Sequence, residues 1–346
     1  MRASRLMSVA ASAALLVALA GCAQSSDTSS EGGTAASAGS SDAFPVTIDH
    51  AFGETTITAK PKRVATVSWA NHEVPLALGV VPVGMSKATW GDDDGNGVLP
   101  WVEDRLTQLD AKTPVLFDET DGIDFEAVAD TRPDVILAAY SGLSKSDYET
   151  LSKIAPTIAY PKTAWGTTLD QMIEMDSEAI GLGAEGKQLE SRLKTDVADA
   201  VAKHPQLQGK TAMFGYFDPS DLSKVGFYST LDQRARFFEQ LGMTAPNAVE
   251  EASAKSTEFY LTLSAEDADR LDDVDVIVTY GDEALLKKLQ ADPLIGKIPA
   301  IARGSVVLLP DSTPQAAEAN PTPLSISGGE DDTYIDAVAA AVTKAG

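Results

Sequence analysis

Short apolar strands alternate with helices through most of this chain, and this alternation is the feature that most restricts its fold. After an opening hairpin over 46–57, the first half contains predicted strands over 63–67, 80–85, 114–116, 133–138 and 157–160, with helices over 72–78, 124–131 and 148–154. The pattern restarts with strands over 210–215, 275–280 and 305–309 and helices over 233–241, 265–271, 283–290 and 333–344. Strands separated by helices pair in parallel and are covered on both faces. We therefore expect an α/β fold with two Rossmann-like βα lobes.

A long helical stretch separates the two halves. Apolar residues recur at helical spacing over 168–203, and glycines within 181–183 divide the stretch into two helices. We expect an N-terminal lobe over 44–167, a connecting helix over 168–205 and a C-terminal lobe over 206–346. A ligand would lie in the crevice beyond the carboxyl ends of the strands. A single connecting helix allows little twisting, so we expect only modest lobe closure.

The N-terminus has the features of an export signal. Arg2 and Arg5 precede an apolar run over 9–19, and small residues follow up to Cys22, the only cysteine of the chain. The ending Leu-Ala-Gly-Cys is similar to the lipobox of bacterial lipoproteins. This resemblance implies that 1–21 is a lipoprotein signal peptide and that Cys22 carries the lipid. The alternative is an ordinary secreted protein with a stray thiol.

The composition after the signal limits the partners of the chain. Residues 22–43 are rich in Ser, Gly, Ala and Thr and should form a flexible tether. The signal removes two arginines from the 27 basic and 51 acidic residues, which leaves a mature charge of 25 − 51 = −26. Such a charge disfavours nucleic acid and anionic lipid headgroups. No second apolar run reaches the roughly 18–20 residues that span a bilayer, so we expect the protein to be attached to the cell membrane by lipid alone. We expect it to work outside the cytoplasm as a monomer.

Three stretches together identify a family resemblance. The first stretch runs from 61–64 through Glu73 to 79–84. The second consists of 122–126 followed by 132–136, and the third of 263–266 followed by 274–278. In this order and spacing the chain resembles class III substrate-binding proteins of ABC importers, which handle ferric siderophores, cobalamin and haem. The resemblance covers nearly all of 44–346. It implies that the chain binds its ligand without making or breaking a bond.

The resemblance also implies how the receptor meets its permease. The docking carboxylates of the family correspond to Glu126 and Glu266, one in each lobe, and each would meet an arginine of the permease dimer. Each glutamate follows an Asp or Ser cap in the first turn of a predicted helix. Negative charge is favoured there, and the side chain can stay exposed. The alternative is a simple capping carboxylate.

Aromatic residues follow the predicted strands and could wall a pocket for a large, partly apolar ligand. Those in the loops after strands are Trp69, Trp90, Tyr140, Trp165, Tyr216, Tyr228, Tyr260 and Tyr280. We expect about half of them to be ordinary core or surface rings. The resemblance places Trp69, Trp90, Tyr140, Tyr216 and Tyr260 among the pocket residues, and we add Tyr228 as a candidate.

Arginine and histidine residues refine the choice of ligand. Arg234 begins a helix whose apolar residues enter the core, so its guanidinium should face the cleft and contact siderophore oxygens. Arg236 is a weaker candidate. The only histidines, His50, His72 and His204, should not converge, so we expect no bound metal, and the supply of axial ligands for haem is thin. No resident cofactor is expected.

One further motif is independent of the resemblance. Asp92, Asp94, Asn96 and Glu103 fit the template D-x-D-x-N-G-x5-E of calcium loops. Pro100 at the ninth position and a strand before the loop oppose this interpretation. The alternative is an acidic turn that caps the helix over 101–106.

The leading hypothesis is a lipid-anchored receptor that captures a ferric siderophore and delivers it to an ABC permease. Cobalamin and haem remain alternatives of the same class, and the chemistry of the siderophore stays open. An exported hydrolase is disfavoured because the chain has no G-x-S-x-G elbow, H-E-x-x-H or C-x-x-C motif. A ligand-free adhesive lipoprotein is the remaining class.

Overall fold

The first half of the described chain forms a parallel sheet. The computed structural model describes residues 44–328 and 331–345. The strand order is β5-β4-β3-β6-β7, with β3 at Val64–Thr66, β4 at Gly84–Ser86, β5 at Val115–Phe117, β6 at Val135–Leu137 and β7 at Thr157–Ile158. All neighbouring strands in it are parallel. Because β3 and β6 are buried along their whole length, they appear in the sequence as continuous apolar runs.

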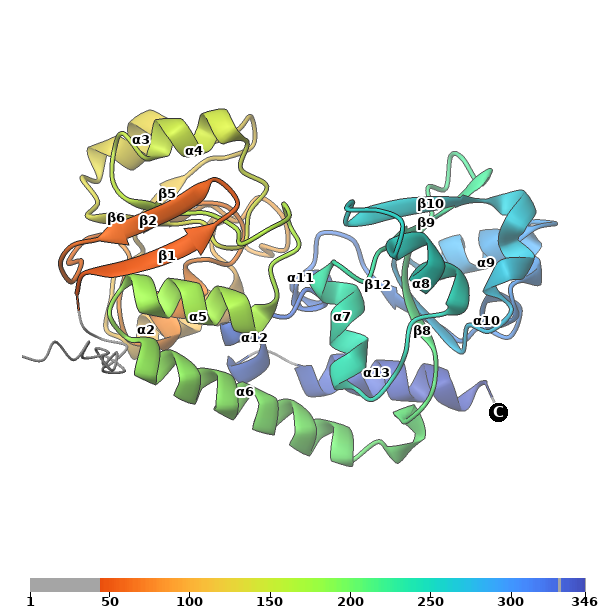
Figure 1. Cartoon of the computed structure of the whole chain (residues 1–346). Helices are drawn as coiled ribbons and strands as arrows, with labels where there is room; N and C mark the ends of the chain where they lie inside the picture. The colour runs from red at the N-terminus through yellow and green to blue at the C-terminus, as the bar shows by residue number, and fades with distance from the viewer. Residues whose placement is uncertain (1–43, 329–330, 346) are drawn as a thin grey trace, which may run out of the picture. The chain divides into compact units, whose positions relative to one another are not determined.

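Helices cover both faces of this sheet. They are α1 (Glu73–Ala77), α2 (Pro100–Gln108), α3 (Phe125–Asp130), α4 (Lys145–Leu151) and α5 (Leu169–Ala179). Val128 of α3 and Leu151 of α4 pack into one core cluster, while Val74 of α1 and Met172 of α5 belong to the other. Figure 1 shows α3 and α4 on one side of the sheet and α5 on the opposite side. The antiparallel hairpin of β1 (Val46–His50) and β2 (Gly53–Ile57) lies beside α5.

The second sheet is mixed. Its order is β10-β9-β8-β11-β12, with β8 at Ala212–Tyr216, β9 at Lys224–Tyr228, β10 at Tyr260–Ser264, β11 at Val276–Tyr280 and β12 at Val306–Leu309. Strands β8, β11 and β12 are parallel, as the sequence predicts, whereas β9 and β10 join as antiparallel strands. Neither was predicted. β10 is only partly buried, so it has no continuous apolar run.

Helices also enclose the second sheet. They are α7 (Gln233–Gln240), α8 (Asn247–Ser253), η2 (Ala265–Leu271), α9 (Glu283–Ala291), η3 (Ile295–Lys297), α10 (Pro299–Ala302) and α13 (Asp331–Thr343). Phe237 of α7 and Val338 of α13 pack on one face, while Leu289 of α9 and Ile301 of α10 pack on the other. The predicted α/β fold with two βα lobes is confirmed.

The segment 168–205 forms two helices, as its glycines predict, and only the second runs between the lobes. The predicted segment 168–205 contains α5, which packs on the first sheet, and α6 (Gly183–Ala202), which runs on to η1 (Pro205–Leu207) and the second lobe. The break falls at Gly181, which has a φ of +68°. At Gly186 a Cβ would lie 2.0 Å from Ser177 Oγ, so this glycine lets α5 and α6 approach closely.

Within the segment predicted as the C-terminal lobe, 206–346, the chain returns once to the first lobe. The short helices α11 (Pro314–Glu318) and α12 (Pro323–Gly328) follow β12. α12 contacts α1, α2 and α6, and Leu324 packs in one cluster with Leu76 and Trp101 of the first lobe. Helices this short show too few turns for an apolar stripe to be read from the sequence.

Glu73 links α12 to the first lobe by hydrogen bonds. Its carboxylate is fully buried and accepts hydrogen bonds from Trp101 Nε1 (2.9 Å) and from the backbone N–H of Leu324 (2.9 Å) at the start of α12. Burial raises the pKa of Glu73 from its ordinary value of 4.5 to about 7. The hydrogen bonds act against this shift, because they favour the charged form.

The titration of Glu73 predicts a pH-dependent stability. Between pH 4.5 and 7 the folded chain holds this proton more tightly than the unfolded chain, so the contribution is complete below pH 4.5. This contribution is lost as the pH rises from 4.5 through 7, and the total loss is about 3 kcal/mol. Urea unfolding at pH 5 and pH 8 should therefore show a smaller difference for Glu73→Gln than for the unaltered protein.

The difference between the two pH values is the decisive quantity for this prediction. Glu73→Gln also places an amide N–H where a carboxylate oxygen accepted a bond, which lowers stability by a similar amount at every pH. Equal pH differences in the two proteins would contradict the assignment to Glu73.

No helix among residues 44–328 and 331–345 has the length and apolar character needed to cross a membrane.

Candidate functional site

The loop after β3 presents Trp69 at the edge of the first sheet. Ser68 and Ala70, its two neighbours, have positive φ angles of 63° and 64°, a conformation that is rare for residues other than glycine. The Glu119 carboxylate accepts the backbone N–H of Ser68 at 2.9 Å, and burial raises the pKa of Glu119 to about 7. Backbone strain of this kind persists only where the surroundings hold it, and it clusters at binding sites.

Asn71 ties this loop to the loop after β6. It is completely buried. Its side-chain amide donates to the carbonyls of Val67 (2.7 Å) and Tyr140 (2.9 Å), and its Oδ1 accepts the Tyr140 N–H at 2.9 Å. Trp69 and Tyr140 therefore lie in a fixed relation. Asn71 was not predicted, because its burial and its bonds to Tyr140 appear only in the folded chain.

The second lobe contributes an arginine held by several partners. Asp232 caps α7, is fully buried, and accepts two bonds from the Arg234 guanidinium at 2.8 and 2.7 Å. The guanidinium lies 3.7 Å from the centroid of the Tyr228 ring and donates to Tyr280 Oη at 3.2 Å. Burial raises the pKa of Tyr228 to about 12, which keeps the phenol neutral beside the arginine. Two further N–H groups of Arg234 have no partner among the described residues.

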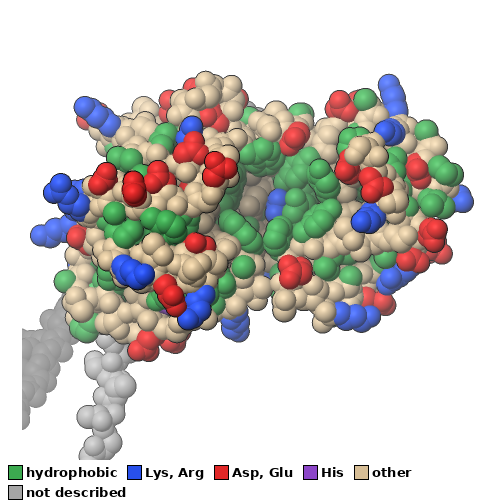
Figure 2. Space-filling model, turned by 90° about the horizontal axis from the view of Figure 1, so that it is seen from above, with side chains coloured by type: hydrophobic (Ala, Val, Ile, Leu, Met, Phe, Trp, Pro, Cys, Tyr) green, Lys and Arg blue, Asp and Glu red, His purple; other side chains and the backbone are tan. Residues whose placement is uncertain are grey.

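These elements enclose a pocket of about 230 Å³ between the two sheets. Its lining consists mostly of rings and comes from both lobes: Trp69, Trp90, Tyr140, Trp165, Asp232, Arg234, Phe259, Tyr280 and Asn320. Figure 2 shows a hollow walled by hydrophobic side chains, with acidic side chains scattered over the surrounding face. We call this the cleft pocket.

The rings of the cleft pocket form a continuous series across the two lobes. Trp69 contacts Trp90 with ring centroids 6.1 Å apart, and Trp90 meets Tyr280 edge-on at 5.4 Å. Trp90 Nε1 also donates to Asp311 of the second lobe at 3.1 Å. On the opposite wall, Tyr140 and Trp165 are perpendicular at 5.4 Å. Rigid rings of this kind offer apolar contact at little cost in conformational entropy.

Two polar atoms of the cleft pocket have no partner in the described chain. Trp69 Nε1, a donor, and Asn320 Oδ1, an acceptor, are buried without a hydrogen bond. Asn320 Nδ2 reaches Tyr140 Oη at 3.4 Å, and burial raises the pKa of Tyr140 well above its ordinary range. A buried unpaired polar atom is costly, so such atoms at a pocket wall indicate where a ligand would bond.

The predicted ligand-binding residues fall into two groups. Trp69, Trp90, Tyr140 and Arg234 line the cleft pocket, and Tyr228 lies under the Arg234 guanidinium. Contact of these residues with ligand stays a prediction.

Tyr216 and Tyr260 do not line the cleft pocket. Tyr216 ends β8 and is 42% exposed, whereas Tyr260 begins β10. A Cβ at Gly226 would lie 2.0 Å from Tyr260 Oη, so the Tyr260 ring lies against β9. Tyr228 ends β9 and Tyr260 begins β10, so both residues belong to strands. The sequence prediction placed them in loops because it did not include β9 and β10.

Arg236, His50 and His204 have structural partners, whereas His72 Nδ1 is buried without a hydrogen bond in the described chain. Arg236 donates to the carbonyls of Thr230 and, at 3.3 Å, of Gly166 in the first lobe. His50 bonds Thr55, and His204 pairs with Asp336 at 2.7 Å. His72 is fully buried, and burial lowers its pKa to about 4. None of these residues lines the cleft pocket.

The predicted calcium loop is an internally bonded turn before α2. Asp92 accepts the backbone N–H groups of Asp94, Gly95 and Gly97, and Asn96 Nδ2 donates to Asp94 and Glu103. The three acids at 92–94 have oxygen atoms within 4.8 Å of one another. The bonds of Asp92 stay within the loop, and α2 begins at Leu99 without a side-chain cap, so the loop is an acidic turn that does not cap the helix. Calcium binding stays a hypothesis that a calcium titration followed by thermal melting tests.

Both predicted docking glutamates are exposed at capped turns. Glu126 lies in the first turn of α3, where the Asp124 side chain accepts the Ala127 N–H at 2.9 Å. Glu266 follows the Ser264 cap of η2, which is a 3₁₀ segment rather than the predicted α-helix. Their role in docking stays a prediction.

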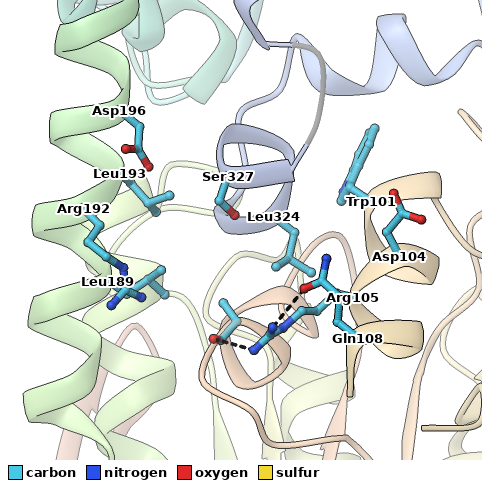
Figure 3. Close-up of a pocket in the computed structure, with 11 residues that line it drawn as sticks. Trp101, Asp104, Arg105, Gln108, Leu189, Arg192, Leu193, Asp196, Leu324 and Ser327 are labelled. Carbon is cyan, nitrogen blue, oxygen red and sulfur yellow. Dashed lines mark hydrogen bonds between the residues drawn. The ribbon is translucent and has the colours of Figure 1, made fainter. Parts of the chain in front are cut away.

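A second cavity, of about 350 Å³, lies between α2, α6 and α12. Figure 3 shows Arg105 at its lower end, bonded to Gln108 and to the carbonyl of Ala77. Arg105 also donates to the Leu76 carbonyl at 2.9 Å, so it caps the end of α1. Although this cavity is larger than the cleft pocket, its one aromatic ring is Trp101 and the guanidinium of Arg105 is already bonded. Its lining residues belong to the packing of α12 against α2 and α6.

The comparison with known families decides the class of the protein. The profile of the Periplasmic binding protein family matches residues 64–313, more than half of the chain. The chain belongs to the periplasmic binding protein family. It is a binding protein of an extracytoplasmic transport system and not an enzyme, which confirms the expected class.

Individual members of the periplasmic binding protein family resemble the chain over most of its length. The crystal structure of Streptococcus pneumoniae TIGR4 PiaA in complex with ferrichrome is 44% identical, covers 87% of this chain and 99% of its own, and superposes with a TM-score of 0.83. The probable siderophore-binding lipoprotein YfiY of Bacillus subtilis (strain 168) is 26% identical over 68% of this chain and 67% of its own. The Fe(3+)-citrate-binding protein YfmC of the same organism is 24% identical over 73% and 75%.

Proposed function

We propose that this chain is an extracytoplasmic receptor that binds one ferric siderophore in the cleft pocket and delivers it to an ABC permease. The single observation that carries the proposal is the ring-lined pocket with one buried arginine, in a chain 44% identical to a protein solved with ferrichrome. Rings suit the apolar surface of a large chelate, and the arginine suits its oxygen atoms. Binding requires no resident cofactor, and the receptor acts as a monomer.

The charge of the cleft pocket favours a neutral chelate. Arg234 is the only basic residue among the lining residues, and its charge is balanced by the buried Asp232. A ferric trihydroxamate has no net charge at the metal, because three hydroxamate anions balance Fe³⁺. A ferric tris-catecholate carries three negative charges, which this pocket would leave uncompensated after desolvation. We therefore propose hydroxamates as the siderophore class.

Cobalamin and haem receive less support. Haem would need an axial ligand, and no histidine lies among the residues that line the cleft pocket. Tyr140 and Tyr280 offer phenols, but burial raises the pKa of both above the ordinary value of 10.0, which disfavours the phenolate that would bind haem iron.

Tryptophan fluorescence tests the proposed function directly. Three of the four tryptophans, Trp69, Trp90 and Trp165, line the cleft pocket, whereas Trp101 is buried elsewhere. A bound ferric complex should therefore quench most of the emission. We expect saturable quenching with ferric hydroxamates and little with ferric catecholates or metal-free ligands. Native mass spectrometry with the same panel would give the stoichiometry, and silence across the whole panel would overturn the proposal.

We further propose lipid attachment at Cys22 and permease contact through Glu126 and Glu266. The signal at 1–21, Cys22 and the tether over 22–43 lie outside the described residues, so support for the anchor comes from the sequence motif alone. The exposed, capped positions of Glu126 and Glu266 support the docking role.

The anchor predicts that Cys22→Ala releases the receptor. Cell fractionation should move the full-length variant from the membrane to the soluble fraction. Its affinity for the ferric siderophore should equal that of the detergent-solubilised parent, because the pocket lies within residues 69–320. An affinity loss in the released variant would show that anchor and receptor are not separate.

A further inference from the structure

A third cavity adjoins the cleft pocket in the second lobe. It measures about 390 Å³, and its lining includes Tyr216, Phe217, Tyr280, Asp282, Lys288 and Asp311. These residues gather at the carboxyl ends of β8, β11 and β12, the edge of the sheet at which α/β proteins bind ligands. We call it the side pocket.

The side pocket and the cleft pocket share a wall. Tyr280 lines both, and Asp311 of the side pocket accepts the hydrogen bond from Trp90 of the cleft pocket. The cleft pocket alone, at about 230 Å³, is smaller than the roughly 300–1,000 Å³ that ligand sites usually occupy. A chelate that fills the cleft pocket would therefore extend past Tyr280 toward the side pocket.

The chemistry of the side pocket differs from that of the cleft pocket. Asp282 and Asp311 are both exposed at its mouth. The N–H groups of Ala284 and Leu285 bond one Asp282 oxygen, and Trp90 and Ser312 bond one Asp311 oxygen. The second oxygen of each carboxylate has no partner among the described residues. The exposed Tyr216 ring lines the same pocket.

Carboxylates together with a phenol ring suit a cation. An ammonium group gains from the carboxylate charge and from the face of the ring. Lys288 is the one basic residue that lines the side pocket, and it donates to the Pro219 carbonyl. Two negative charges against one positive leave the side pocket with a net negative charge.

We propose that the side pocket is a subsite for a positively charged side arm of the siderophore, in particular a primary ammonium group. This inference rests on the proposed function, and it adds a second recognition element to it. The neutral chelate occupies the ring-lined cleft pocket, while the arm passes Tyr280 and meets Asp282, Asp311 and the face of Tyr216.

A pair of ligands that differ only in this charge tests the subsite. Ferrioxamine B is a linear ferric trihydroxamate with a terminal ammonium group, and its N-acetylated derivative keeps the chelate but loses the charge. Titrations of the full chain by fluorescence quenching should show the ammonium form binding about five- to tenfold more tightly, the size expected for an exposed ion pair with a cation–π contact.

Matched variants assign the preference to the acids. Asp282→Asn/Asp311→Asn removes both charges and keeps the acceptors for the α9 cap and for Trp90. In this variant the ammonium form should lose its advantage, so that the two ligands bind equally tightly. Asp282→Asn alone, which leaves the partner of Trp90 unchanged, should reduce the advantage while the acetylated ligand binds as before. Lys288→Gln should increase the preference. A control with the same loss of charge, Glu185→Gln/Asp199→Asn on exposed positions of α6, should leave the preference unchanged.

The outcomes separate the two proposals. Equal binding of the two ligands, a preference that survives loss of both acids, or binding of ferrichrome without either linear ligand would each overturn the subsite and leave the receptor function intact. Failure of every ferric siderophore to bind would overturn the proposed function, and the subsite with it.

Discussion

A chain in which Glu126 and Glu266 are both changed to lysine should bind its ferric siderophore with an unchanged dissociation constant and fail to support uptake. Both carboxylates are exposed, one on α3 and one on η2, and neither lines the cleft pocket. Losing a charged partner at an interface costs about 2–5 kcal/mol. Two such losses, together with repulsion of the permease arginines, predict at least a hundredfold lower uptake of iron-loaded siderophore.

The control for this experiment must carry the same charge change elsewhere. Glu185 on α6 and Glu239 on α7 are also exposed, and their double change to lysine should leave uptake near the parental rate. The single variants Glu126→Lys and Glu266→Lys should each retain partial uptake, because one docking contact remains in each. Normal uptake by the double variant at 126 and 266 would refute the docking role.

Replacing Arg234 by leucine should be the most destabilising single change in the cleft pocket. Asp232 is fully buried, and Arg234 supplies its only ion pair in the described chain. Removing one partner of a buried pair leaves an uncompensated charge, which costs about 3–5 kcal/mol. The same change removes the guanidinium from the Tyr228 ring and from the pocket wall, so siderophore affinity should fall as well.

A double-mutant cycle separates the charge from the packing in this prediction. Asp232→Asn keeps the cap of α7, since asparagine can also accept the Arg234 N–H. Combined with Arg234→Leu, it removes both charges, and urea unfolding should show most of the lost stability restored. Equal unfolding free energies for Arg234→Leu and the double variant would contradict the uncompensated charge as the cause.

The parallel strands of both lobes could be predicted because burial on both faces leaves an unmistakable pattern. Val135, Ile136 and Leu137 of β6 are all buried, and so are most residues of β11. Trp69, Trp90 and Tyr140 follow β3, β4 and β6 in the sequence and line the cleft pocket, because the carboxyl ends of parallel strands meet at one edge of a sheet. Their contact with a ligand stays a prediction.

The remaining features depend on contacts between distant residues, which periodicity does not reveal. β10 shows no apolar run, so the antiparallel strands went unseen and Tyr228 and Tyr260 were placed in loops. The buried partners Asp232 and Asn71 look like ordinary polar residues until the fold brings them to Arg234 and Tyr140.

The return of the chain to the first lobe has a consequence for folding during synthesis. Glu73 and Leu324 meet across 251 positions, so the first lobe lacks the helix that covers Leu76 and Trp101 until the last residues have been made. Domains commonly fold one after another as they emerge, and non-local contacts slow folding. Here the lobe made first should wait for the end of the chain, and both lobes should unfold in one cooperative transition.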